Sequence, residues 1–122
     1  MVAETAAGMA LPYELSDVFP LTVAAIENAV KRVAGGVYVL DPPDPRTKAP
    51  IGFVGRSDTD VADGLHRHAK AGYTRFAFAY TKSPMDGYRR ECQMWHDWKP
   101  SANPLHPTPP AGNAVRCLIC NK

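Results

Sequence analysis

A glutamate interrupts the apolar face of the helix that the sequence predicts over residues 84–98. This face carries residues at positions i, i+4 and i+7, namely Tyr88, Cys92 and Trp95. Glu91 shares it, and an ionised carboxylate that faces the interior is costly unless it is paired or bound to a metal ion. One interpretation is therefore a divalent-cation ligand, such as a Mg²⁺ ligand beside a phosphate. The other is a structural ion pair with Arg56, Arg67 or Arg75.

A second set of metal-binding residue types joins the same helix to the C-terminal tail. Cys117 and Cys120 have the CxxC spacing that makes half of a zinc site. Cys92 and His106 would complete the site, with His96 as the alternative fourth ligand. Because the tail lacks apolar periodicity, a Zn²⁺ ion between tail and helix would hold it in place. The alternative is that the tail cysteines are reduced and exposed, and that Cys92 is simply buried.

These residues require strands and helices to position them. Apolar runs predict three strands, over residues 37–41, 51–55 and 73–80. Helical periodicity and capping residues predict three helices, over residues 21–33, from 57–60 to about 71, and 84–98. A proline-rich connection over residues 42–50 joins the first two strands, because proline cannot donate to a regular ladder. The order indicates an α/β fold in which helices flank a three-stranded sheet, followed by an irregular, proline-rich tail.

The chain has 122 residues, which is the size of one domain, and 45% of them are hydrophobic. We divide it into an N-terminal tail and helix (1–34), a core (35–99) and a tail (100–122). No apolar run approaches the roughly 20 residues that span a bilayer. An acidic residue, Glu4, precedes any basic one, which argues against a secretory signal. We therefore expect a cytoplasmic protein with no membrane contact, whose cysteines are reduced or metal-bound.

Charge is distributed unevenly along the chain. Residues 1–30 contain four acidic residues and no lysine or arginine, whereas residues 66–99 contain seven lysines or arginines against three acidic residues. A basic half is compatible with a phosphate-rich partner such as DNA. The alternative is an ordinary solvated surface on which the charges partly cancel.

Two short sequences resemble the signature strands of the GIY-YIG nucleases: Gly36-Val37-Tyr38 and Phe53-Val54-Gly55. This family includes excision-repair endonucleases, homing endonucleases and some restriction enzymes. The resemblance covers residues 36–104. It implies a three-stranded antiparallel sheet flanked by helices, and hydrolysis of DNA phosphodiester bonds that depends on Mg²⁺ or Mn²⁺.

The resemblance also implies roles for individual residues. Tyr38 matches the first signature tyrosine, a general base or water-positioning phenol. Glu91 matches the metal-binding glutamate, His68 a histidine on the helix after the second strand, and Asn103 a late asparagine.

Two positions depart from the family pattern. Phe53 replaces the second tyrosine, and Gly64 stands where the catalytic arginine is expected. Arg56 and Arg67 are the candidates to replace that arginine, because a guanidinium binds phosphate bidentately. The sequence thus favours a metal-dependent DNA endonuclease, with a related module that binds nucleic acid or protein without cleavage as the alternative. The predicted DNA-binding residues are Arg56, Arg67, Lys70 and Asn103.

Overall fold

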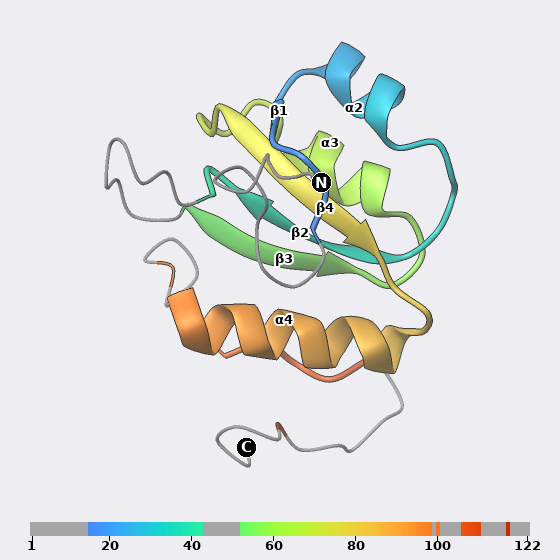
Figure 1. The fold of residues 1–122 in the computed structure, drawn as a ribbon, viewed down its shortest axis with the longest axis vertical. Helices are drawn as coiled ribbons and strands as arrows, with labels where there is room; N and C mark the ends of the chain where they lie inside the picture. Colours follow the sequence, from blue (N-terminus) through green and yellow to red (C-terminus); the bar gives the residue numbers. More distant parts are fainter. Residues whose placement is uncertain (1–14, 43–51, 99, 101–105, 111–116, 118–122) are drawn as a thin grey trace, which may run out of the picture.

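The computed structural model describes residues 15–42, 52–98, 100, 106–110 and 117. Four strands and three helices follow one another along this part of the chain (Figure 1). Their bounds are β1 (Phe19–Pro20), α2 (Val23–Ala29), β2 (Gly36–Leu40), β3 (Phe53–Ser57), α3 (Val61–His68), β4 (Arg75–Tyr80) and α4 (Pro84–Trp98).

The strands form one antiparallel sheet in the order β1-β4-β2-β3. The α/β class and the antiparallel pairing agree with the sequence prediction, but the predicted number of three strands is wrong. The strand missing from the prediction is β1, whose two residues pair with Phe76 and Arg75 of β4. Such a short strand has no alternation to detect, and its second residue is a proline, which is tolerated only because β1 lies at the sheet edge.

The helices match their predictions to different degrees. The longest, α4, has the predicted bounds, and α3 begins after the N-cap Asp60, whose carboxylate accepts a hydrogen bond from the Ala62 amide. The first helix, α2, is shorter than predicted and ends at Ala29. Val33, the last residue of the predicted helix, is 86% exposed because it lies beyond the end of the observed helix.

Helices cover both faces of the sheet. Figure 1 shows α2 and α3 on one side and α4 on the other. Because successive residues of a strand point to opposite faces, Tyr38 and Leu40 of β2 enter the core beneath α2 and α3. Val37 and Val39 enter a second core with Met94 of α4. Every residue of β2 is therefore buried.

The third strand, β3, forms the other edge of the sheet, and its residues face the two helical layers alternately. Phe53 packs against the core beneath α3, whereas Val54 belongs to the core beneath α4. By the same alternation Gly55 faces α3 and Arg56 faces α4. This edge positions the candidate site. Within the described residues, no helix has both the length and the apolar character needed to cross a bilayer.

Candidate functional site

Arg56 is the centre of a polar network between β3 and α4. The aliphatic part of its side chain packs on Gly87, and a Cβ atom added at residue 87 would come within 3.2 Å of the arginine Cδ. Its guanidinium lies 5.6 Å from the centroid of the Tyr88 ring. The side chain is only 11% exposed. A buried guanidinium must find acceptors for its N–H groups, and the surrounding residues supply them.

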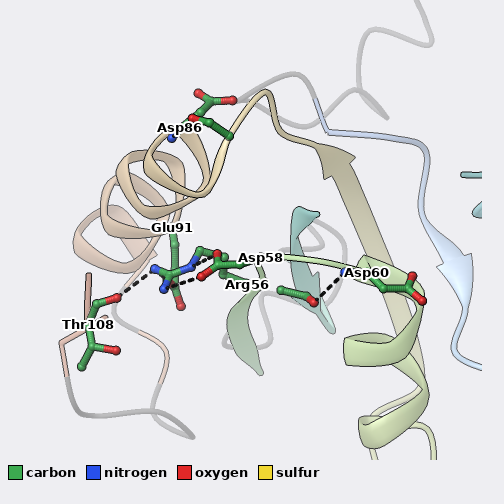
Figure 2. A network of polar contacts seen from close by, with 8 residues as sticks. Arg56, Asp58, Asp60, Asp86, Glu91 and Thr108 are labelled. Carbon is green, nitrogen blue, oxygen red and sulfur yellow. Dashed lines mark hydrogen bonds and ion pairs between the residues drawn. The ribbon is translucent and has the colours of Figure 1, made fainter. Parts of the chain in front are cut away.

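Three groups accept hydrogen bonds from Arg56 (Figure 2). Its Nε donates to Asp58 Oδ1 at 2.7 Å. Its Nη1 donates both to Glu91 Oε1 and to the Thr108 carbonyl, each at 2.9 Å. Arg56 thus connects β3, helix α4 and the segment 106–110, which are distant in sequence.

Glu91 faces the protein interior, as the stripe of α4 predicted, and its side chain is 12% exposed. Of the three arginines considered as partners, the structure selects Arg56. Arg67 instead pairs with Asp63 at 3.6 Å, and Arg75 donates to the Pro42 carbonyl at 3.1 Å. Burial raises the pKa of Glu91 to about 7, although the charge of Arg56 opposes the shift. The carboxylate of Asp58 contributes to the rise, so one guanidinium serves two acidic groups.

Tyr38 lies on the opposite face of the sheet from Arg56, and its ring crosses β3. The ring passes directly over Gly55, and a Cβ atom at Gly64 would come within 3.1 Å of Tyr38 Cε1 and 3.4 Å of its hydroxyl. Burial raises the pKa of Tyr38 to about 12, the charge of Arg67 lowers it, and that of Glu91 raises it. The phenol is therefore within electrostatic reach of predicted site residues from both helical layers.

The tyrosine belongs to a cluster of rings at this edge of the sheet. Phe53, at the position that the GIY-YIG resemblance assigns to a second tyrosine, stacks on Tyr38 at a centroid distance of 6.3 Å. His68 lies 4.6 Å from Phe53 and 5.7 Å from Tyr38, and Tyr73 completes the cluster. Burial and the charge of Arg67 lower the pKa of His68, so its imidazole is neutral at neutral pH.

Arg67 lies in the last turn of α3, with a side chain that is 68% exposed. Lys70 is exposed just beyond the end of that helix. The structure thus brings Arg67, His68 and Tyr38 together on the α3 side, and Arg56 and Glu91 on the α4 side.

A cluster of three metal-binding side chains includes Cys92, the residue that follows Glu91 on α4. The donor atoms of Cys92, His106 and Cys117 lie within 4.8 Å of one another, so the cluster could hold a metal ion. Both thiols are buried, and among the described residues neither forms a disulfide. His96 is near the cluster, with its Nε2 3.4 Å from the Cys117 sulfur. The sequence prediction therefore paired the helix with the correct segments of the tail.

One nitrogen of the His106 ring contacts the backbone of its own segment. Its Nδ1 lies 2.7 Å from the Pro107 carbonyl oxygen, which can only accept a hydrogen bond. In this contact Nδ1 carries the proton, so Nε2 is the nitrogen of the neutral ring that can bind a metal ion. When the His106 ring is protonated, its charge lowers the pKa of Glu91, so the two sites are close to each other.

Two predicted residues, Asn103 and Cys120, lie outside the described residues. Conversely, the sequence analysis missed Asp58 and Thr108 as partners of Arg56. Asp58 falls in the range 57–60, for which the sequence predicted only the start of a helix, although its position two residues after Arg56 allows a local ion pair. Thr108 contributes its backbone carbonyl, for which no residue type is diagnostic.

No family model matches the chain, and no curated protein or solved structure matches it significantly. Similarity to GIY-YIG nucleases thus stays a prediction that rests on the residues of β2, β3, α3 and α4.

Proposed function

We propose that the chain is a metal-dependent endonuclease that hydrolyses DNA phosphodiester bonds. The observation that carries this proposal is the course of the Tyr38 ring over Gly55 and beside Gly64. It places the phenol within reach of the charges of Arg67 and Glu91, although these residues come from two different helices. A phenol, an imidazole, a carboxylate and a cation around one strand edge are the groups that phosphodiester hydrolysis needs.

In this proposal Tyr38 orients a water molecule or a phosphate group and does not act as the general base. Because its pKa is raised to about 12, the hydroxyl is protonated at neutral pH and donates a hydrogen bond to a water molecule or a phosphate oxygen. His68 is the better proton acceptor, since its lowered pKa keeps the imidazole neutral. Arg67 and Lys70 are exposed and can bind the DNA backbone.

The charges at Glu91 fit a divalent cation. When both carboxyl groups are ionised, Asp58 and Glu91 carry two negative charges against the single positive charge of Arg56, and a bound cation would favour that ionised form of Glu91. Glu91 would hold Mg²⁺ or Mn²⁺, whose chemical contribution is to polarise the scissile phosphate and stabilise the leaving oxygen. Arg56 then keeps the buried carboxylate in place.

A nicking assay on supercoiled plasmid and branched DNA, with Mg²⁺ or Mn²⁺, tests the proposal. We expect nicking by the wild type and a loss of about a hundredfold or more in Glu91→Gln and Tyr38→Phe, as for other positioned catalytic groups. Arg75→Lys is the control, because Arg75 forms a similar backbone hydrogen bond from β4. Equal nicking by wild type and Glu91→Gln would exclude a catalytic role for the carboxylate.

A second function is supported by two specific observations. Gly64 leaves no guanidinium at the position expected for the catalytic arginine, and Arg56 already donates to three acceptors. Both features suit a module that binds nucleic acid or protein without cleaving. DNA binding that depends on Arg67 and Lys70, without nicking by any variant or metal, would establish this function.

For the metal cluster we propose Zn²⁺. Two thiolates and one imidazole are preferred zinc ligands, and Cys120 or His96 supplies the fourth. A closed site of four protein ligands is structural rather than catalytic. Metal analysis of the purified chain should find about one zinc per chain, and Cys117→Ser should lose it. Buried thiols that form no disulfide among the described residues also favour a cytoplasmic location, where cysteines stay reduced.

A further inference from the structure

The metal cluster and the Arg56 network use the same two pieces of chain. Helix α4 contributes Cys92 to the cluster and the preceding residue, Glu91, to the network. The segment 106–110 contributes His106 to the cluster and the carbonyl of Thr108 to the network. An ion in the cluster would therefore fasten together the two segments that Nη1 of Arg56 bridges.

The segment between the two sites is stiff because of its sequence. It reads His-Pro-Thr-Pro-Pro, and Pro107 separates His106 from Thr108. Proline fixes its own φ angle, and a following proline restricts the residue before it to extended backbone. Both His106 and Thr108 precede a proline, and Pro107 and Pro110 are buried. The position of the His106 ring is thus transmitted to the Thr108 carbonyl with little backbone freedom between them.

We infer that residues 106–108 form a metal-held strap that positions Arg56 against Glu91. Arg56 is a positioning residue in this arrangement, and the metal ion acts on Glu91 through it. Nη1 of Arg56 donates to both Thr108 and Glu91 in the structure. A bound ion would anchor the strap at His106 and stabilise this arrangement, and loss of that anchor would favour a guanidinium held by carboxylates alone. This inference rests on metal binding by the cluster and is independent of DNA cleavage.

Reciprocity makes the inference measurable. If the ion strengthens the bond between Arg56 and Thr108, then that bond must strengthen metal binding by the same factor. Hydrogen bonds from a charged donor are worth enough that losing one weakens binding about tenfold or more. Arg56→Lys keeps the positive charge but cannot supply the same fork of donors. We therefore expect Arg56→Lys to weaken Zn²⁺ affinity about tenfold or more, although residue 56 is not a ligand.

The experiment is a competition titration of Zn²⁺ between the protein and a chromophoric chelator, without DNA. Arg75→Lys is the matched control, because it is the same substitution of an arginine that donates to a loop carbonyl. It should change the affinity by no more than about twofold. Pro107→Gly, which retains both His106 and the Thr108 carbonyl but frees the backbone between them, should make the affinity nearly insensitive to Arg56→Lys.

Three results would overturn the inference. Wild-type affinity in Arg56→Lys would show that the network and the cluster are uncoupled. An undiminished effect of Arg56→Lys in the Pro107→Gly background would show that the strap does not carry the coupling. A chain that binds no metal would remove the cluster itself. If Arg56→Lys does not fold, ¹⁵N NMR of the wild-type guanidinium replaces it, and Nη1 exchange must slow when Zn²⁺ is added.

Discussion

Tyr38 lies so close to Gly55 that a Cβ atom at residue 55 would come within 2.5 Å of the phenol Cζ and 2.6 Å of its hydroxyl. The two residues pair across β2 and β3, so the ring crosses the neighbouring strand at the point where that strand has no side chain. Gly55 is therefore explained by the space that the Tyr38 ring needs and not by a turn.

We expect Gly55→Ala to destabilise the fold by about 1–3 kcal/mol, the usual cost of an extra carbon in a filled site. The change is measured as the free energy of unfolding in urea. Tyr38→Leu provides the control, because it removes the ring that the new methyl group would meet. If Gly55→Ala costs as much in the Tyr38→Leu background as in the wild type, the ring is not the obstacle.

The glycine at residue 64 gives a prediction about charge. A guanidinium introduced by Gly64→Arg would begin next to Tyr38, since the Cβ position is 3.4 Å from the hydroxyl. A nearby cation favours the phenolate, so the pKa of Tyr38 should fall from about 12 by about one unit or more. Ultraviolet titration of tyrosinate measures this. Gly64→Gln has a similar length without the charge and should leave the pKa of Tyr38 unchanged, and an equal fall in both variants would rule out the electrostatic cause.

Strongly patterned parts of the fold were predictable from the sequence. Helix α4 has its predicted bounds because Ser83 and Pro84 form a clear start and its apolar residues recur regularly. The observed bounds of β2 and β3 differ from the predicted bounds by one and two residues. An apolar run marks the buried residues of a strand and not the ends of its hydrogen-bonded ladder. Strand β1 was missed because two residues cannot express a period, and its pairing with β4 is a tertiary contact.

The candidate site was predictable where residue type determines the chemistry. The inward position of Glu91 and the grouping of Cys92, His106 and Cys117 followed from helical spacing and ligand type. Helical spacing and ligand type did not identify Arg56 as the partner of Glu91. All arginine side chains have the same reach, and only the register of the sheet determines which arginine lies beside Glu91. The Thr108 carbonyl was equally hidden, since every residue has such an acceptor.

The pKa of Tyr38 predicts how stability depends on alkaline pH. Its folded value of about 12 lies above the ordinary value of 10.0, so the folded chain holds the phenolic proton more tightly than the unfolded chain does. This contribution is fully present below pH 10 and is lost as the pH rises toward 12. It amounts to about 3 kcal/mol for a shift of two units in a group that is 4% exposed.

Unfolding free energies measured from pH 8 to 12 should therefore fall more steeply for the wild type than for Tyr38→Phe. The phenylalanine variant has the same ring but no proton to lose, so it is the appropriate control. Parallel curves for the two proteins would show that the phenol is not buried as the structure places it.

The last prediction concerns Arg56 and Glu91. It tests whether their ion pair contributes a coupling energy to stability or whether the two residues act independently. Arg56→Leu removes the cation and leaves the buried carboxylate of Glu91 and the partly exposed carboxylate of Asp58 without it, which should destabilise the fold by about 3–5 kcal/mol. Adding Glu91→Leu removes one of those carboxylates as well, and apolar replacement of both partners is often close to neutral. The double variant should therefore be more stable than Arg56→Leu alone. If the two substitutions instead add, the 2.9 Å contact between Nη1 and Oε1 carries no coupling energy.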